Sequence, residues 1–367
     1  MISLVEAQEI VIGGCHKLDT VLADCQQMAG RVVAQDVVAT EFIPPFANSA
    51  VDGFAVRAQD VKTVGVELEV LGVIGAGHIA NYEISEGQTA RIMTGAPVPR
   101  GADAIVMIED ATVLSETRVL CNKPAQIGDA IREIGEDVKT SDVVFAAGSV
   151  INPAGVGVLA AINARQVLTY PRLRVAMLST GDELVINGGD LKPGQIRESN
   201  LTMLATMISA TDCEVINLGI IDDDEAKLEK TLREVASRCD AIVTSGGVGQ
   251  GDFDVVKIVL SRIAEMQWMQ MAIKPAKPFA FGRLKTNDSR VIPVFGLPGN
   301  PVSSMISFEM LARPALRKMM GHTQNLTRPK VLAVVDKQMK RRRDGKIHLM
   351  RVFGVFENDG RLHVRDT

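Results

Sequence analysis

Carboxylates and glycines that could handle an oxyanion together with a divalent cation follow several predicted strands in the second half of the chain. Glu183, Asp223 and Asp254 supply hard oxygen ligands of the kind that Mg²⁺ prefers beside phosphates. Gly246 and Gly247 predict a turn whose backbone N–H groups are open to an anion. These residue types together predict the handling of phosphate, or of a similar anion, with a divalent cation.

Two further segments strengthen this pattern. Gly299-Asn300-Pro301 opens a predicted helix, and the exposed N–H groups at a helix N-terminus attract anions. Lys274 and Lys277 add positive charge. Each segment also has a plainer reading, because Gly-Gly is commonly a tight turn and Lys-Pro commonly ends a loop. Their coincidence favours a binding site, and chemistry alone predicts a phosphate-handling α/β domain.

The elements that would position these residues alternate between strand and helix from residue 172 onward. Strands are predicted at 175–178, 214–218, 241–244, 268–273, 279–281 and 291–295, and helices at 201–209, around Leu228–Ala236, at 255–263 and from Pro301. This alternation predicts a doubly wound, mostly parallel sheet. Ligands bind such sheets at the carboxyl ends of the strands, which is where the polar residues fall.

The rest of the chain has a different texture. Apolar residues at helical spacing over 18–25 predict that the first 35 or so residues are helical, and Gly30 would end that helix. Short β-like runs separated by Gly, Pro and Asp predict a β-rich module over about 32–150. Residues 153–165 predict another helix, and the pattern is β again after residue 329.

Composition and length exclude several classes of protein. A chain of 367 residues with 46% hydrophobic and 23% charged residues predicts two to four globular domains. The net charge of −4 argues against nucleic-acid binding, and no apolar stretch approaches the roughly 20 residues of a membrane span. The five cysteines and five histidines are dispersed, without zinc-site spacing. The N-terminus lacks a signal-peptide pattern, so we expect a cytoplasmic protein with reduced cysteines.

Longer motifs carry a resemblance to a known family. Residues 44–55 read PPFANSAVDGFA and residues 91–99 read RIMTGAPVP. With these, and in the same order as in the MoeA/gephyrin E-domain family, come segments 101–106, 135–137, 179–183, 194–200, 245–254, 274–281 and 296–303. The chain therefore resembles that family from about residue 40 to residue 305.

The resemblance implies a multidomain α/β plus β fold. It consists of an elongated discontinuous domain (1–46 and 141–171), an inserted β-rich domain (47–140), a central α/β domain of the molybdopterin-binding type (172–327) and a small C-terminal β-domain (328–367). That last domain is shorter than is usual in the family, which predicts a truncated or abbreviated domain.

The resemblance also implies an activity and its partners. It implies a molybdopterin molybdenumtransferase that inserts molybdate-derived molybdenum into adenylylated molybdopterin, with Mg²⁺ as cofactor and release of AMP. It implies a homodimer whose site lies between the α/β domain of one subunit and the inserted domain of the other. The molybdopterin adenylyltransferase and apo-molybdoenzymes are implied as further partners, without nucleic acid or membrane.

Site residues follow from the resemblance position by position. The catalytic set is Asp52, Thr94, Glu183, Asp223 and Asp254, of which the last three are also the metal ligands. The residues that bind molybdate and the pterin phosphate are Ser245, Gly246, Gly247, Lys274, Lys277, Pro298, Gly299, Asn300, Pro301 and Ser303. Asp52 and Thr94 each precede a glycine, so a role as turn formers stays open, and Pro298 and Pro301 equally suit loop shaping.

Departures from the family pattern leave alternatives open. They are Ala47, Val51, Ala130, Ile134, Gly249 and Ala276. Loss of a hydroxyl at Gly249 removes one hydrogen bond to a ligand, worth about 1 kcal/mol. A catalytically weak paralogue, or a scaffold that binds pterin or nucleotide without turnover, is the main alternative. An adenylyltransferase or nucleotide-processing relative would lack residues 40–140, and a plain binding protein would need acidic residues that do not bind metal.

Overall fold

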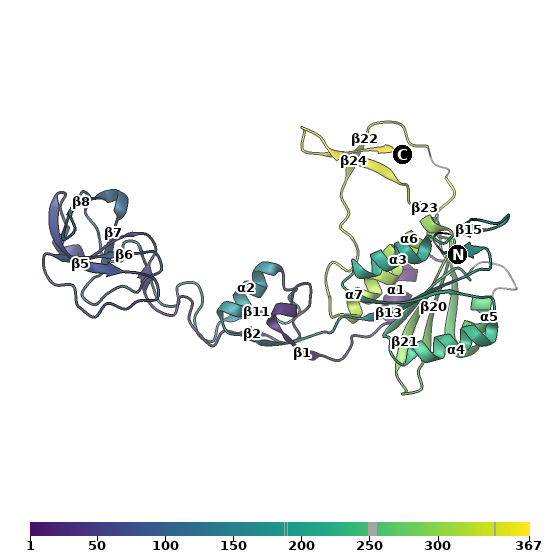
Figure 1. Ribbon diagram of the computed structural model, residues 1–367. Helices are drawn as coiled ribbons and strands as arrows, with labels where there is room; N and C mark the ends of the chain where they lie inside the picture. Colours follow the sequence, from purple (N-terminus) through teal and green to yellow (C-terminus); the bar gives the residue numbers. More distant parts are fainter. Residues whose placement is uncertain (187, 189, 249–254, 341–342) are drawn as a thin grey trace.

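The computed structural model describes residues 1–186, 188, 190–248, 255–340 and 343–367. It is an extended molecule, with a large α/β unit and a small C-terminal sheet at one end and a β-rich unit at the other (Figure 1). A narrow connecting part lies between them. The predicted multidomain α/β plus β fold is confirmed, while the predicted domain limits stay a prediction.

The α/β unit is built on a six-stranded sheet. Its strands, in spatial order, are β16 (Glu214–Ile221), β13 (Arg174–Thr180), β17 (Ala241–Ser245), β21 (Val291–Leu297), β20 (Pro278–Lys285) and β18 (Ala264–Gln270). The first four are parallel, whereas β20 and β18 run antiparallel to their neighbours. The mostly parallel sheet is thus confirmed, with an antiparallel edge because β20 and β21 are joined by a tight turn.

Helices cover both faces of this sheet. One face carries α1 (Leu4–Gly13), α3 (Asn200–Ser209), α6 (Pro301–Ser307), the π-helical turn η4 (Phe308–Ala312) and α7 (Arg313–Met319), and the other carries α4 (Glu225–Ala236) and α5 (Val255–Ile263). Strand β13 serves both cores, because Val175 and Met177 pack on one side and Ala176 and Leu178 on the other. A strand buried on both faces reads as a continuous apolar run, as this one does.

The N-terminal prediction is wrong in part. Helix α1 begins after Ser3, whose hydroxyl accepts a hydrogen bond from the N–H of Glu6 at 3.1 Å, and it packs in the core of the α/β unit. Residues 18–25, predicted as helix, instead contain strand β1 (Val21–Asp24), so Gly30 does not end a helix. Leu22 is 67% exposed and Ala23 is 5% exposed, so pairing with a distant strand overrides the helical spacing.

The connecting part is formed where the chain leaves and re-enters the α/β unit. Strand β1 pairs with β12 (Gln166–Thr169), and β2 (Val37–Val38) pairs with β11 (Val143–Phe145). The 3₁₀-helix η1 (Cys25–Gln27) and α2 (Pro153–Ala161) close a small core around the buried Met28.

The β-rich unit inserted between these strands has a six-stranded sheet of its own. The spatial order is β7 (Ala104–Met107), β4 (Gly53–Val56), β6 (Gln88–Ile92), β5 (Val66–Ile74), β9 (Arg118–Cys121) and β8 (Ala111–Ser115). The remaining elements are β3 (Asn48–Ser49) paired with β10 (Ile131–Arg132), and the 3₁₀-helices η2 (Ala58–Asp60) and η3 (Ile108–Asp110). Phe54 and Ala55 of β4 point into two different cores, so this sheet too is covered on both faces.

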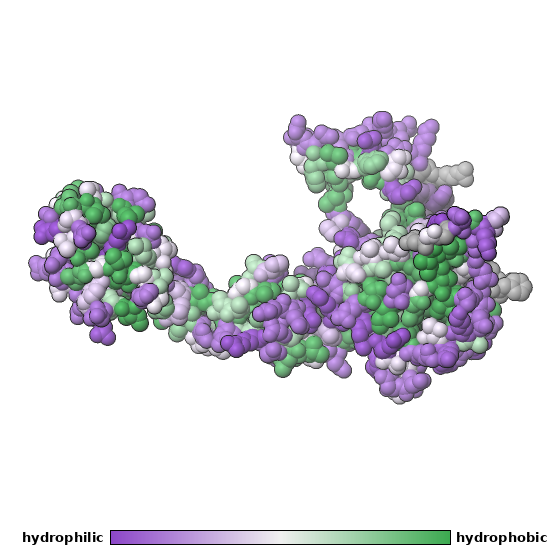
Figure 2. Space-filling view, in the orientation of Figure 1, coloured by the Kyte–Doolittle hydropathy of each residue, from purple (hydrophilic) through white to green (hydrophobic). Residues whose placement is uncertain are grey.

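The C-terminal β-domain is small and open. Strands β22 (Ala333–Val335), β25 (Leu362–Asp366) and β24 (Val352–Phe356) form its sheet, and β23 (Ile347–His348) pairs with β19 (Ile273–Lys274) of the α/β unit. Every residue of β24 is exposed, and Figure 2 shows hydrophobic surface on this unit. Within the described part of the chain, none of the helices combines the length and the apolar character needed to cross a membrane.

Candidate functional site

Two of the predicted carboxylates reach the same edge of the α/β sheet because their strands are neighbours. Glu183 follows β13, and Asp223 follows β16. Thr180 and Ile221, the last residues of these parallel strands, are register partners. Glu183 and Asp223 are both exposed, and both line one cavity of about 520 Å³.

The predicted glycine loops complete the wall of this cavity. Ser245, Gly246, Gly247 and Gly299 line it together with the two carboxylates. Ser245 ends β17 and is the register partner of Leu297, the last residue of β21, which brings the two loops side by side. Topology alone therefore assembles the predicted strand-end loops around one cavity, as parallel strands require.

The Gly246-Gly247 turn has a backbone that favours glycine. Gly246 has a φ of 95° and Gly247 a φ of 77°. The Gly246 N–H donates to the carbonyl of Leu297 at 3.0 Å, so it is not free for an anion as the sequence suggested. Its hydrogen bond instead fixes the turn against β21.

Asn200 is a lining residue to which the sequence analysis assigned no role. Its amide nitrogen donates to Ser245 Oγ at 2.8 Å and to the Gly299 carbonyl at 2.7 Å. It lines the cavity, is 7% exposed, and ties the start of α3 to both loops. The nearby Glu198 accepts from Ser179 Oγ at 3.0 Å. Glu198 also accepts from the N–H of Leu201 at 2.9 Å and so caps α3, whereas no local sequence signal indicates the contacts of Asn200 with the two loops.

The predicted helix N-terminus is present but capped. Asn300 Oδ1 accepts from the N–H groups of Val302 at 3.1 Å and Ser303 at 3.2 Å, and Pro301 has no N–H. Pro298 is buried beneath this turn. None of Pro298, Asn300, Pro301 and Ser303 lines the cavity. An oxyanion would have to displace the Asn300 side chain to reach these N–H groups.

The predicted lysines lie at the same sheet edge without lining the cavity. Lys274 and Lys277 are exposed in the segment that joins β18 to β20, beyond Gln270 and before Pro278. The backbone carbonyl of Lys274 accepts from the N–H of Leu349, which attaches the C-terminal domain beside it. Both side chains are exposed to solvent beside this contact.

Asp52 and Thr94 form a separate pair on the inserted domain. Asp52 immediately precedes β4 and Thr94 follows β6, and these strands are antiparallel neighbours. Asp52 Oδ1 accepts from both the N–H and the hydroxyl of Thr94, each at 2.7 Å. These two hydrogen bonds lower the pKa of Asp52 below its usual range. Both residues are exposed. They belong to the β-rich unit, which lies at the opposite end of the molecule from the α/β unit (Figure 1).

Comparison with known proteins places the chain in a family. The MoeA N-terminal region (domain I and II) matches residues 2–163, and a probable molybdopterin binding domain matches residues 176–318. Molybdopterin molybdenumtransferase of Haemophilus influenzae is 36% identical over 342 residues, which are 93% of this chain and 83% of that protein. The chain belongs to the MoeA family.

Other MoeA family members also resemble the chain over most of its length. Molybdopterin molybdenumtransferase 2 of Mycobacterium tuberculosis is 37% identical over 331 residues, 88% of this chain and 80% of that protein. A crystal structure of molybdopterin biosynthesis moeA protein from Pyrococcus horikoshii OT3 has a TM-score of 0.79 and 28% identity, covering 99% of this chain and 89% of that one. The architecture above is thus that of MoeA proteins.

Two of the MoeA-pattern positions lie outside the described residues. Asp254, the third predicted metal ligand, and the departure at Gly249 both fall there. No group of three or more His, Cys, Asp or Glu placed to hold a metal occurs in the described ranges. The roles assigned to the fifteen predicted positions therefore remain predictions, although the structure gathers six of them around one cavity: Glu183, Asp223, Ser245, Gly246, Gly247 and Gly299.

Proposed function

We propose that this chain is a molybdopterin molybdenumtransferase that inserts molybdate-derived molybdenum into adenylylated molybdopterin and releases AMP. The observation that carries the proposal is the cavity in which Glu183 and Asp223 face the Ser245–Gly247 and Gly299 loops, in a chain of the MoeA family. Membership supports the molybdopterin substrate, and the mixture of carboxylates and backbone loops supports phosphoanhydride chemistry.

The residues present suit Mg²⁺ as the cofactor. Mg²⁺ is commonly held by one or two carboxylates together with substrate phosphates and water, and Glu183 and Asp223 supply two carboxylates on one cavity. Bound there, Mg²⁺ would neutralise charge on the phosphoanhydride as it is cleaved. Asp254 would be the third ligand, as the family resemblance implies.

The chain's own groups would bind and orient the substrate. The Gly247 and Gly299 backbone can approach an oxyanion closely, because neither residue has a side chain. Lys274 and Lys277 would hold molybdate or the pterin phosphate from the rim. Asn200 would keep the Ser245 and Gly299 loops at a fixed separation, so the ligand meets a preorganised wall.

Asp52 and Thr94 would act on the same substrate from a second subunit. Within one chain they belong to the β-rich unit, whereas the cavity is lined by residues of the α/β unit at the other end of the molecule (Figure 1). A homodimer in which the inserted domain of one subunit covers the α/β cavity of the other would join both sets. The ionised Asp52, fixed by Thr94, would then position the attacking oxygen. The adenylyltransferase that supplies the substrate and the apo-molybdoenzymes that receive the product would be its cytoplasmic partners.

The test is AMP release from adenylylated molybdopterin with Mg²⁺, with and without molybdate. We expect molybdate-dependent release that falls at least about 100-fold in Glu183→Ala and Asp223→Ala, as for loss of one electrostatic contact to a transition state. Asp182→Ala and Asp222→Ala are matched controls, because these neighbouring carboxylates are exposed and do not line the cavity. Tight binding without release would support a scaffold or weak paralogue instead.

A further inference from the structure

A second polar cavity lies where the elongated domain, the connecting part described above, meets the α/β unit. It has a volume of about 390 Å³ and is lined by residues 147–150, by Arg317 and by residues 322–325. Figure 1 shows α7, which carries Arg317, on the side of the α/β unit that faces the elongated domain. This hinge cavity shares no lining residue with the proposed active site.

Arg317 brings a positive charge to the hinge cavity. Its Nη2 donates to His322 Nδ1 at 3.1 Å, and its buried Nε lacks a hydrogen-bond partner within the described part of the chain. Arg313 and Arg328, which lie nearby, share the carboxylate of Glu309 at 3.5 and 2.8 Å. Burial first, and then Arg313, lower the pKa of Arg317, and the attraction of the nearby Asp212 carboxylate offsets only part of this shift.

His322 adds a neutral hydrogen-bond donor. It is 3% exposed, and burial followed by the charges of Arg317 and Arg313 lowers its pKa to about 4. Because the neutral ring accepts from Arg317 on Nδ1, its proton must sit on Nε2. That Nε2–H has no acceptor among the residues that the structure describes, so it is a donor available to a ligand at the cavity wall.

The rest of the lining suits an anion. The other polar lining side chains are Ser149, Thr323, Gln324 and Asn325, and the lining contains no Asp or Glu. Another cavity of similar size, about 380 Å³, has acidic as well as basic residues in its lining. Asp19 and Asp240 lie there together with Lys17, Arg283 and Arg290. Only the hinge cavity, of these two, combines a cation with an acid-free wall.

We propose that the hinge cavity is a binding site for a tetrahedral oxyanion, held by the Arg317 guanidinium and the His322 Nε2–H. An anion there would accept charge-assisted hydrogen bonds from Arg317, whose buried Nε has no partner among the described residues, and a further one from His322. It would also bridge residues 147–150 of the elongated domain and residues 322–325 of the α/β unit. The cavity volume of about 390 Å³ is many times the roughly 30 Å³ that one water molecule occupies. A tetrahedral oxyanion would therefore leave room, and a phosphate ester would also fit.

Equilibrium dialysis of the full chain with inorganic phosphate tests the proposal. Hydrogen bonds to a charged group imply that Arg317→Gln raises the Kd for phosphate about tenfold or more, with a smaller rise for His322→Gln. Arg283→Gln is the matched control, since this arginine lines the other cavity and pairs with Glu265. Lys274→Gln combined with Lys277→Gln should weaken only phosphate binding at the proposed active site and leave the component that Arg317→Gln removes, which separates the two sites.

Molybdate and AMP provide the second and third arms of the test. Equal binding of phosphate and molybdate would identify a site for free oxyanions, whereas tighter binding of AMP would identify a phosphate ester. Absence of phosphate binding, or binding unaffected by both Arg317→Gln and His322→Gln, would overturn the proposal. Arg317→Lys, which keeps the charge and loses the planar fork, serves if Arg317→Gln does not fold. These assays do not depend on AMP release, so their outcome is independent of the proposed function.

Discussion

At the scale of single residues, the departure at Ala276 has a structural consequence. Ala276 has a φ of 72° and is 3% exposed, a left-handed conformation that favours glycine, the residue usual at this place in the family pattern. We predict that Ala276→Gly raises the free energy of unfolding by up to about 1 kcal/mol, because relief of the left-handed strain exceeds the entropy cost of glycine. Urea unfolding measures the change.

A control distinguishes relief of strain from a general effect of glycine. Ala205 lies within helix α3, where alanine is the best residue. Ala205→Gly should lower the free energy of unfolding by about 1 kcal/mol. Destabilisation by Ala276→Gly of similar size would contradict the interpretation.

The five cysteines differ in their expected reactivity. Burial raises the pKa of Cys15 and Cys213 to about 12, and that of Cys121 and Cys239 to about 11. A thiol with such a pKa is almost wholly protonated at pH 8, and only the thiolate is nucleophilic. We predict that iodoacetamide at pH 8 labels the native chain at the half-buried Cys25 alone, as read by peptide mass spectrometry. Rapid labelling of Cys239 in the folded protein would refute this.

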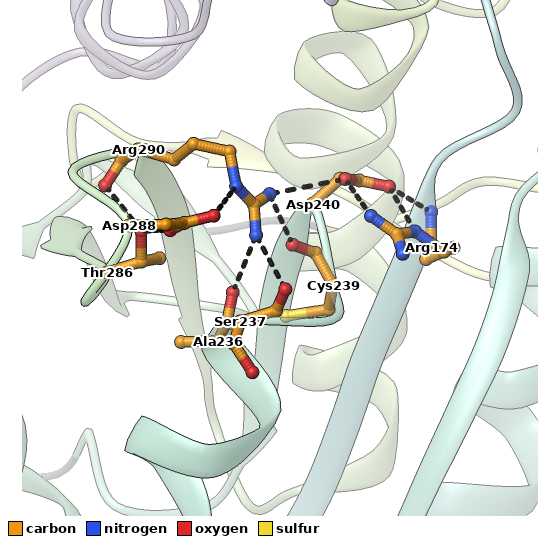
Figure 3. A network of polar contacts seen from close by, with 8 residues as sticks. All are labelled: Arg174, Ala236, Ser237, Cys239, Asp240, Thr286, Asp288 and Arg290. Atoms are coloured by element: carbon orange, nitrogen blue, oxygen red, sulfur yellow. Dashed lines mark hydrogen bonds and ion pairs between the residues drawn. The ribbon is translucent and has the colours of Figure 1, made fainter.

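At the scale of elements, one buried carboxylate links the ends of two strands and one helix of the α/β unit. Figure 3 shows Asp240 between Arg174 and Arg290. Its oxygens accept from the Arg174 N–H at 2.8 Å and from the Arg174 Nη2 at 2.9 Å. Arg290 in turn donates to carbonyls at and just after the C-terminus of α4, those of Ala236, Ser237 and Cys239. The network therefore fixes the start of β13, the start of β17 and the end of α4 together.

We predict that Asp240→Ala lowers the free energy of unfolding by about 2–3 kcal/mol, because it leaves Arg174 and Arg290 without their shared partner. Denaturant unfolding followed by circular dichroism measures the change. Asp288→Ala is the matched control, since Asp288 also pairs with Arg290 but is exposed, and we expect a much smaller loss. Equal losses would show that the buried Asp240 contributes no more to stability than the exposed Asp288.

The C-terminal sheet contains a pH-sensitive contact. His363 Nδ1 lies 2.6 Å from Asp336 Oδ1, and its Nε2 lies 3.2 Å from Asp359 Oδ2. Both ring nitrogens must donate to these carboxylates, so the contacts favour the imidazolium, and the hydrogen bond to Asp336 is the main cause that raises the pKa of His363 above 6.5. A raised folded-state pKa means that the contribution to stability is fully present below pH 6.5 and is lost as the pH rises through the folded-state pKa.

Amide hydrogen exchange of β22 and β25 measures this effect. We predict that protection of these strands, corrected for intrinsic exchange, falls as the pH rises above 6.5. In His363→Gln the protection should be low throughout and independent of pH. Protection that rises with pH in the wild-type chain would contradict the assignment.

The elements show which features the sequence could and could not predict. The main strands and helices between Arg174 and Met319 were predictable from their apolar patterns, and their alternation predicts a mostly parallel sheet. The spatial order of the strands does not follow from that alternation. Strand β1 was not, since its partner β12 lies far along the chain and its spacing also fits a helix. At the site, strand ends predicted Glu183 and Asp223, whereas the supporting hydrogen bonds of Asn200 depend on loop geometry that no local pattern encodes.

At the scale of the whole molecule, the separation of the two candidate sets leads to a prediction about mixed dimers. In the proposed homodimer each site takes Glu183 from one subunit and Asp52 from the other. A dimer of one Asp52→Ala chain and one Glu183→Ala chain then contains one site with both changes and one site with neither. Random mixing of the two variants should restore about one quarter of wild-type AMP release, because about half of the dimers are mixed and each has one intact site of two.

The measurement is AMP release after unfolding and refolding the two inactive variants together. A mixture of Asp52→Ala with Thr94→Ala is the control, since both residues belong to the inserted domain and every site in its dimers carries one change. We expect no recovery in this control. Recovery in neither mixture would show that the two sets do not share a site across subunits, while intact dimers by sedimentation would exclude failure of assembly as the cause. Recovery in the first mixture alone would assign the cavity and the Asp52–Thr94 pair to one active site, formed only when two elongated chains meet.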